Sequence, residues 1–268
     1  MKLHEISLIA AAGNTISVKA CGKGSAIIFL HGFPLDHRMW LSQLIELSDR
    51  FYCLAIEVRG FGGSSLDGEY LLQDLADDVE QVRRLLSPDQ PVHLVGLSMG
   101  GYVAFEYWRK YRQNLATLTL ANTKPGADSE DAKQQRLQMA ERVKREGVWP
   151  ALQSMVSRLM APEAVESSVG LRVAEMLQSA SPSAVATAQT AMASRQDFCQ
   201  QLPLIRTPCL VMAGGHDVIT PADATEQWAA NLPNHKLRII PSAGHLSPME
   251  SPEQFTADLV EFLIGHTP

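Results

Sequence analysis

Residues 92–104 read VHLVGLSMGGYVA, and this stretch decides the fold. A short apolar run leads into Gly-x-Ser-x-Gly, and residues typical of a helix follow. In that order a buried strand turns sharply into a helix, and the turn lifts the hydroxyl of Ser98 above the end of a sheet. Gly96 and Gly100 leave room for the turn, because side chains at these two positions would clash. We therefore expect Ser98 to be a nucleophile.

Similar apolar runs recur along the chain, each bounded by turn residues and followed by a helical pattern. They cover 26–30, 52–58, 92–95, 115–121, 210–213 and 236–240. Continuous apolar runs suit strands that are covered on both faces, and their alternation with helices is typical of a parallel sheet. Amphipathic patterns at 70–86 and 252–264 predict two of the flanking helices. The fold class is therefore α/β, with a mostly parallel central sheet flanked by helices.

The strand pattern disappears between residues 122 and 202, where the sequence becomes helical in character. A helix is expected over 128–147, ending at Gly147, and a second one begins at Pro150. The second helix carries an apolar stripe at Leu152, Met155, Val156, Leu159 and Met160. We interpret 122–202 as a helical cap, inserted into a core made of 1–121 and 203–268.

A serine nucleophile needs a base and an acid that orients the base, in the chain order Ser, Asp or Glu, His on this type of fold. Asp217 follows an apolar run and a Gly-Gly turn, and His245 follows the next such run. All three side chains should therefore emerge at one rim of the sheet. Glu57 and Asp128 are rival acids. A metal site made of His216, Asp217 and His245 is disfavoured, because no HxH or HExxH spacing supports it.

An acyl-transfer site also needs donors for the oxyanion of the tetrahedral intermediate. We assign this role to the backbone N–H groups of Phe33, which follows the strand at 26–30, and of Met99, which follows the nucleophile. His31 is expected to brace the loop rather than to take part in chemistry. The glycine cluster at 58–65 lacks the G-x-G-x-x-G spacing, so no nucleotide cofactor is implied.

These motifs resemble those of the α/β-hydrolase superfamily. His31-Gly32-Phe33-Pro34, the Arg-Gly-x-Gly loop at 59–64, the serine turn and the late Asp217 and His245 appear in the family's order. Serine at position 98 separates the chain from the dehalogenase and epoxide-hydrolase branches, which resemble it but use Asp there. The sequence is similar to cap-bearing carboxylesterases and to 3-oxoadipate enol-lactonases. One departure is Glu57, where many relatives have Asp.

Composition limits the partners and the compartment. The 268 residues are 46% hydrophobic and 19% charged, with 23 Lys and Arg against 29 Asp and Glu. This acidic balance, without long basic runs, argues against nucleic acid and membrane surfaces as partners. Neither a signal peptide nor a transmembrane run is apparent, and the four cysteines have no CxxC spacing. We expect a cytoplasmic protein without disulfides, with Cys53 and Cys209 buried in strands.

The function that follows is hydrolysis of small to medium, mainly apolar carboxylic esters through an acyl-enzyme, with no metal or cofactor. The substrate pocket is predicted to involve Phe33, Trp40, Met99, Trp149, Leu152 and Met155. The alternative is an enol-lactone hydrolase, which would need a cationic anchor such as Arg142, Arg145 or Arg158. A perhydrolase, a carbon–carbon bond hydrolase and a non-catalytic ligand receptor are further alternatives. The partner is a small-molecule ester or lactone, and the oligomeric state stays open.

Overall fold

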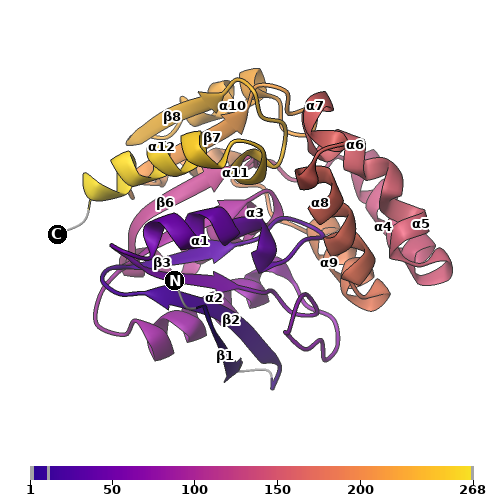
Figure 1. Cartoon of the computed structure of the whole chain (residues 1–268), viewed down its shortest axis with the longest axis horizontal. Coiled ribbons are helices and arrows are strands. Elements are labelled where there is room, and N and C mark those ends of the chain that lie inside the picture. The colour runs from indigo at the N-terminus through magenta and orange to yellow at the C-terminus, as the bar shows by residue number, and fades with distance from the viewer. Residues whose placement is uncertain (1–2, 11–12, 267–268) are drawn as a thin grey trace.

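A computed structural model describes residues 3–10 and 13–266 (Figure 1). Within these residues the strands form one sheet in the order β1-β2-β4-β3-β5-β6-β7-β8. The strands are β1 His4–Ile9, β2 Thr15–Gly22, β3 Ala26–Leu30, β4 Tyr52–Ile56, β5 Val92–Leu97, β6 Leu115–Ala121, β7 Cys209–Gly214 and β8 His235–Ile240. β2 pairs antiparallel with both of its neighbours, β1 and β4. The remaining pairs, from β4–β3 across the sheet to β7–β8, are parallel. The predicted α/β class and mostly parallel sheet are confirmed.

The middle of the sheet is covered on both faces. Every residue of β3, β5 and β7 is buried, which is why these strands appear in the sequence as continuous apolar runs. The covering helices include α1 Leu41–Leu47, α2 Leu72–Leu86, α3 Met99–Tyr111, α10 Ala222–Ala229, α11 Ser247–Glu250 and α12 Pro252–Ile264. α1 packs against α12, and α2 packs against α3. The predicted helix at 252–264 matches α12, whereas α2 begins two residues later than the pattern at 70–86 indicated.

All regular secondary structure between β6 and β7 is helical. It contains α4 Glu130–Glu146, α5 Val148–Leu152, α6 Val156–Leu159, α7 Pro162–Val165, α8 Ser168–Ser179 and α9 Pro182–Ala193, with 3₁₀ turns at Gln153–Met155 and Cys199–Leu204. We call α4 to α9 the cap helices. Figure 1 shows them side by side at one end of the sheet, with α4 packed against α9. The division of the chain at 122 and 202 stays a proposal.

The expectation of one continuous helix from Pro150 was wrong. α5 begins at Val148, directly after Gly147, whose φ of 87° allows a sharp turn out of α4. The backbone then tightens into the 3₁₀ turn at Gln153–Met155 before α6 begins. The apolar stripe nevertheless survives the break, since Leu152, Val156, Leu159 and Met160 are buried and Met155 is half-buried.

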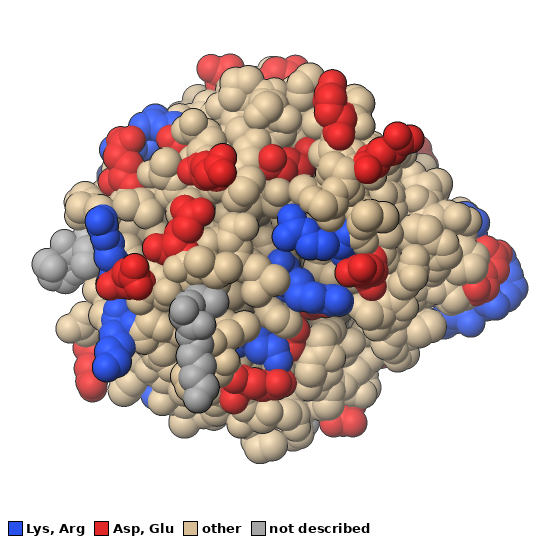
Figure 2. All heavy atoms as spheres, viewed as in Figure 1, with Lys and Arg blue, Asp and Glu red and all other residues tan. Residues whose placement is uncertain are grey.

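Two further expectations concern the interior and the surface. Cys53 and Cys209 are buried, as predicted from their places in strand-like runs. On the face that Figure 2 shows, acidic and basic side chains are scattered within a surface formed mostly by other residues. No helix among the described residues is both long and apolar enough to cross a membrane.

Candidate active site

Ser98 stands at the junction of β5 and α3 in a strained backbone conformation. Its φ is 54°, a region that residues other than glycine rarely adopt. A Cβ atom on Gly96 would lie 2.3 Å from Gly100 O, and one on Gly100 would lie 2.3 Å from Leu30 O. Both glycines are therefore required by close backbone packing, as the sequence indicated. The turn leaves the Ser98 side chain partly accessible, whereas its neighbours Leu97 and Met99 are buried.

The structure brings Ser98, His245 and Asp217 into one hydrogen-bonded line. Ser98 Oγ is 2.8 Å from His245 Nε2, and Asp217 Oδ2 is 2.7 Å from His245 Nδ1. Because a carboxylate only accepts hydrogen bonds, this arrangement favours the tautomer with the proton on Nδ1. Nε2 is then free to accept the hydroxyl proton of Ser98. The three residues follow β5, β7 and β8, whose carboxyl ends meet at the same edge of the sheet.

Asp217 is held as a carboxylate by many donors. The backbone N–H groups of Ile219 and Thr220 donate to Oδ1, at 2.8 and 3.0 Å. The Thr220 hydroxyl and the Asn122 amide donate to Oδ2, at 2.6 and 2.9 Å. Burial alone would raise the pKa of Asp217, but the hydrogen bonds from His245, Asn122 and Thr220 outweigh burial and lower the pKa to about 2. The acid therefore stays charged near neutral pH.

Besides Thr220, the sequence analysis missed Asn122 and Glu250, which also support this line. Asn122 donates to Asp217 and to Gly244 O at 3.1 Å, and it accepts from Ser247 Oγ at 2.6 Å. Its φ of 45° suits asparagine better than most residues. Glu250 accepts from Gly244 N and Leu246 N, both at 2.9 Å, and so holds the backbone on either side of His245. No motif marks either residue, since both act through loops that meet only in the folded chain.

The rival acids are engaged elsewhere. Glu57 Oε1 is 2.6 Å from His37 Nδ1, and Asp128 is paired with Arg136 and Arg195. His37 therefore has an acidic partner that the sequence did not reveal. His31 behaves as a brace, since its Nε2 accepts from Val58 N at 3.1 Å.

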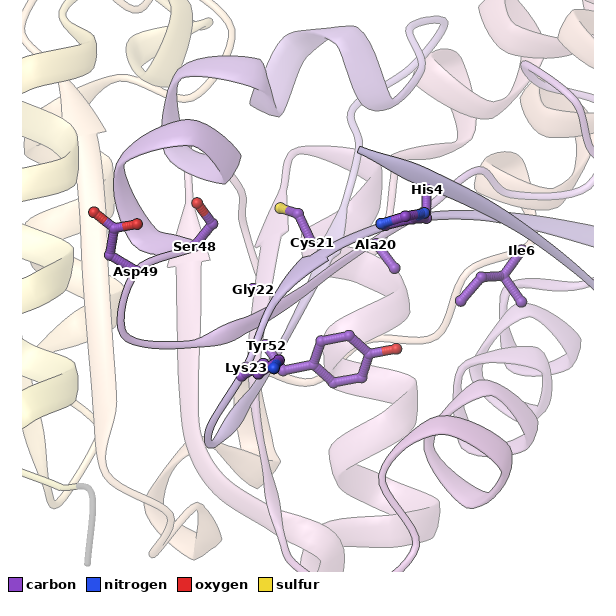
Figure 3. A pocket seen from close by; sticks show the side chains of 9 residues that line it. All are labelled: His4, Ile6, Ala20, Cys21, Gly22, Lys23, Ser48, Asp49 and Tyr52. Carbon is purple, nitrogen blue, oxygen red and sulfur yellow. The ribbon is translucent and has the colours of Figure 1, made fainter. Parts of the chain in front are cut away.

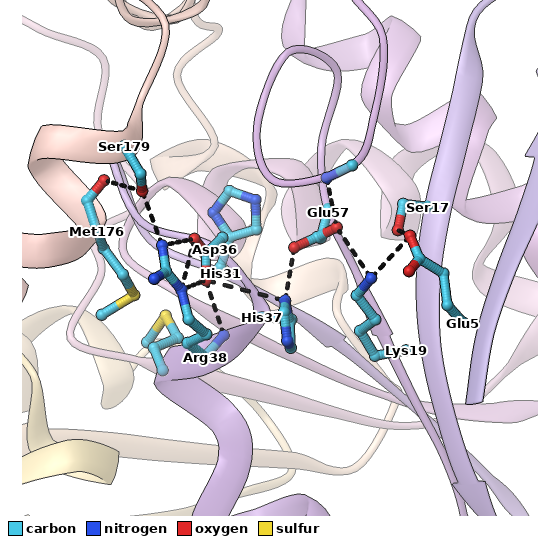
Figure 4. A network of polar contacts seen from close by, with 12 residues as sticks. Glu5, Ser17, Lys19, His31, Asp36, His37, Arg38, Glu57, Met176 and Ser179 are labelled. Atoms are coloured by element: carbon cyan, nitrogen blue, oxygen red, sulfur yellow. Dashed lines mark hydrogen bonds and ion pairs between the residues drawn. The ribbon is translucent and has the colours of Figure 1, made fainter. Parts of the chain in front are cut away.

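One cluster of possible metal ligands occurs among the described residues. It consists of Asp36, His37 and Glu57, whose ligand atoms lie close enough together to hold a metal ion. Figure 4 shows that these groups already form a polar network. Both oxygens of Asp36 accept from Arg38, and the Lys19 ammonium lies 3.9 Å from Glu57 Oε2. Because the positive charges of Arg38 and Lys19 already lie next to the cluster, they would repel a metal cation. The donor set therefore fits a metal ion poorly.

One proposed oxyanion donor, Met99, directly follows Ser98, and the other, Phe33, follows Gly32, where an added Cβ would lie 3.5 Å from Ser98 Cβ. Met99 is the first residue of α3, and Phe33 lies in the buried loop after β3. In the part of the chain that the structure describes, neither backbone N–H donates to a side chain or to another element. Both groups are thus available to an incoming oxygen atom, and their role stays a proposal.

The predicted pocket residues do not all lie together. Leu152 and Met155 line a hollow of about 350 Å³ between the cap helices and the core. Trp149 packs half-buried against the hydrophobic core and is not among the residues lining that hollow. Trp40 must be corrected: it is fully buried, and its ring packs between Phe29 and Phe255 as part of the core. Its large indole fills the space between β3 and α12 rather than lining a pocket.

Other hollows lie away from the line of three residues. One of about 630 Å³ is at the edge of the sheet, where β1 and β2 meet the end of α1 (Figure 3). It is lined by His4, Ile6, Ala20, Cys21, Gly22, Lys23, Ser48, Asp49 and Tyr52. None of these residues contacts Ser98, Asp217 or His245 through a recorded hydrogen bond within the described chain.

Comparison with known proteins adds the family. The family model described as the alpha/beta hydrolase fold matches residues 25–252, which is most of the chain. The chain belongs to the α/β-hydrolase family. The resemblance inferred from the sequence motifs is therefore confirmed.

Among solved structures, this α/β hydrolase is similar to a thermophilic esterase from Thermogutta terrifontis with malate bound. The two are 38% identical with a TM-score of 0.93, and the match covers 100% of both chains. Among curated proteins it is 27% identical to 3-oxoadipate enol-lactonase 1 of Acinetobacter baylyi, over 95% of both chains. It is also 26% identical to a 2-(acetamidomethylene)succinate hydrolase of Mesorhizobium japonicum, over 93% of this chain and 91% of that one. The three relatives of this α/β hydrolase are thus named as an esterase, an enol-lactonase and a further hydrolase.

Proposed function

We propose that the chain hydrolyses carboxylic esters through an acyl-enzyme formed on Ser98. The observation that carries the proposal is the line from Ser98 Oγ through His245 to Asp217, with bonds of 2.8 and 2.7 Å. A serine hydroxyl is a weak nucleophile unless a base takes its proton, and here the base and its orienting acid are both in place. The 38% identical esterase supports the same reaction class.

The steps follow from this geometry. His245 Nε2 takes the Ser98 proton as Oγ attacks the ester carbonyl, and the N–H groups of Phe33 and Met99 donate to the oxyanion. The intermediate collapses, the acyl–oxygen bond breaks, and the leaving alcohol takes the proton from His245. Water then repeats the sequence on the acyl-enzyme and releases the acid. The chain supplies the nucleophile, base and donors itself, so we propose no cofactor.

The wider assignment rests on the same proposal. We propose that 122–202 act as a cap over the site, that the partner is a small-molecule ester or lactone, and that the enzyme works in the cytoplasm. Neither nucleic acid nor a membrane surface is part of the proposal, since the chain is mildly acidic without long basic runs.

The test is steady-state hydrolysis of p-nitrophenyl acetate, butyrate, octanoate and palmitate at neutral pH. We expect turnover of the shorter esters and a loss of about 10³-fold or more in Ser98→Ala, because the nucleophile is removed. Unfolding of the variant is measured alongside, to separate lost chemistry from lost fold. Equal turnover by wild type and variant, or none on any ester, would overturn the esterase proposal.

An enol-lactone hydrolase is the second candidate. Ring opening of a lactone uses the same acyl-enzyme chemistry, and the 3-oxoadipate enol-lactonase relative covers nearly the whole chain. The malate, oxoadipate and succinate in the names of the three relatives are all dicarboxylic acids. Higher kcat/KM on carboxylated lactones than on any of the four aryl esters would favour this candidate.

A further inference from the structure

The hollow between the cap helices and the core lies beside the loops that carry Asp217 and follow β6. It is lined by Lys124, Asp128, Ala132, Gln135, Arg136, Met139, Ala151, Leu152, Ser154, Met155, Arg158, Gln189 and Ile219. The backbone N–H of Ile219 donates to Asp217 Oδ1 at 2.8 Å. Lys124 follows Thr123, whose hydroxyl donates to Ser98 O at 2.9 Å. The wall of the hollow is therefore continuous with the loops that hold the nucleophile and the acid.

The wall of this hollow carries more positive than negative charge. Its cations are Lys124, Arg136 and Arg158, and its one anion among the described lining residues is Asp128. Asp128 is already neutralised by Arg195, which is 97% buried behind it and bonds both oxygens, at 2.8 Å to Oδ1 and 2.6 Å to Oδ2. Arg136 adds a second bond to Oδ2. Asp128 is thus shared among Arg195, Arg136 and, at 3.8 Å, Lys124, so its single negative charge does not balance the cations of this wall.

Among the described residues that line this wall, Lys124 and Arg158 are the two cations whose side chains donate no hydrogen bond to the protein. Lys124 Nζ is 3.8 Å from Asp128 Oδ1, too far for a hydrogen bond. Arg158 makes no ion pair or side-chain hydrogen bond to any other residue in the described ranges 3–10 and 13–266. Burial, together with the nearby Arg195 guanidinium, lowers the pKa of Lys124. A bound anion would relieve that repulsion, which is a physical reason for this wall to attract one.

The arginines on the outer part of α4 do not share this environment. Arg142 and Arg145 are exposed and both pair with Glu146. Of the three arginines named as possible anchors from the sequence, only Arg158 lines the hollow. Arg142 and Arg145 are therefore corrected: their charges are paired on the surface, away from the wall of the hollow.

We propose that this hollow binds a free carboxylate on the acyl part of the substrate, held by Lys124 and Arg158. This carboxylate site rests on the proposed function. It defines the substrate class as half-esters of short dicarboxylic acids, or lactones that bear a carboxylate. Leu152 and Met155 provide apolar wall for the methylene groups between the two carbonyl carbons. The reaction adds one water across the acyl–oxygen bond. A half-ester then yields an alcohol and a dicarboxylate, whereas a lactone that bears a carboxylate yields one ring-opened dicarboxylate.

The experiment compares monomethyl glutarate with methyl hexanoate, which are similar in length and differ in the terminal carboxylate. Hydrolysis is followed by acid release. We expect kcat/KM for monomethyl glutarate to exceed that for methyl hexanoate by about tenfold or more, the size of one or two hydrogen bonds to a charged group. The ratio should fall at high ionic strength, because salt screens exposed charges.

The variants Lys124→Met and Arg158→Gln test the residues. In the double variant the ratio of the two kcat/KM values should fall about tenfold or more. Arg145→Gln is the matched control, since it removes an exposed cap arginine outside the hollow. A ratio that is the same in wild type and in the double variant, or that falls equally in Arg145→Gln, would overturn the proposal.

A binding measurement keeps this test separate from that of the proposed function. Glutarate should raise the unfolding temperature of the Ser98→Ala protein, and the double change at Lys124 and Arg158 should remove that rise. Binding without Ser98-dependent turnover would sink the esterase proposal and leave the carboxylate site standing. Ser98-dependent turnover of methyl hexanoate without glutarate binding would support the esterase proposal and overturn the carboxylate site.

Discussion

Thr220 and Asn122 show how much of the candidate site depends on residues that do no chemistry themselves. Both donate to Asp217 Oδ2, the same oxygen that accepts from His245. These bonds fix the direction in which the carboxylate faces, and with it the ring of His245. Residues of this kind are positioning residues, and each can be tested through the chemistry of the group it holds.

Thr220→Val removes the hydroxyl donor and keeps the shape of the side chain. Losing the 2.6 Å bond should raise the pKa of Asp217 and reduce kcat about tenfold, with KM little changed. Thr220→Ser keeps the donor and should restore kcat. The measurement is kcat and KM across pH for the three proteins. A value of kcat in Thr220→Val equal to that of wild type would show that the bond has no part in positioning.

The sequence carried enough information to place Ser98, Asp217 and His245, because each follows an apolar run at a glycine-containing turn. It could not reveal Asn122 or Glu250. Their partners lie in loops far along the chain, and the contacts form only when parallel strands bring the loop ends together. The prediction that Trp40 lines the pocket was wrong for a related reason. Sequence alone does not show whether an aromatic residue outside the predicted strands and helices lines a pocket or packs in the core.

Helices and strands, like single residues, were predicted well where local sequence determines them and poorly where distant contacts do. The strands at 26–30 and 115–121 and the helix at 252–264 were predicted to the residue, since each has strong local patterning. The cap was the weaker part. The break between α5 and α6 depends on how these short helices pack against α4 and α8, and composition does not record that packing.

At this scale Gly100→Ala should disrupt the junction of β5 and α3. The new Cβ would lie 2.3 Å from Leu30 O, so strand β3 or helix α3 must shift. We expect a loss of about 3 kcal/mol or more in the free energy of unfolding, together with loss of Ser98-dependent turnover. The matched control is Gly126→Ala, whose Cβ would have its nearest contact at 3.6 Å, with Cys199 Sγ. Denaturant unfolding of both variants measures the difference, and equal losses would refute the packing argument.

For the whole molecule, the buried histidines predict a loss of stability in mild acid. Burial, with the nearby His266, lowers the pKa of His93 from 6.5 to about 4, and burial also lowers the pKa of His31. In the unfolded chain both rings take up protons as the pH falls below about 6.5, whereas the folded chain resists protonation of both rings, and that of His93 until about pH 4. The free energy of unfolding should therefore decrease over this range, by about 3 kcal/mol from His93 alone.

Below pH 4 three carboxylates determine how the free energy of unfolding depends on pH. Glu57, Asp128 and Asp217 each have a pKa lowered to about 2 by donors that outweigh burial, so the folded chain keeps them charged after the unfolded chain has protonated them. Stability present above about pH 4 is then lost as the pH falls toward 2. Asp78 and Glu250, whose pKa values burial raises, act in the opposite direction. Urea unfolding at pH 7, 5.5, 4 and 3 checks both stages, and equal stability at pH 7 and 4 would contradict the first.

The position of the cap helices has a consequence for how this enzyme can change over evolutionary time. They leave the sheet after β6 and return at β7, and these two strands are direct neighbours, with Ala121 opposite Met212. Recombination or insertion within the helical segment therefore alters no strand order and no pairing register. If these helices act as the proposed cap, mutation can explore new specificities in the segment of the gene that encodes them, while the segments on either side preserve the chemistry.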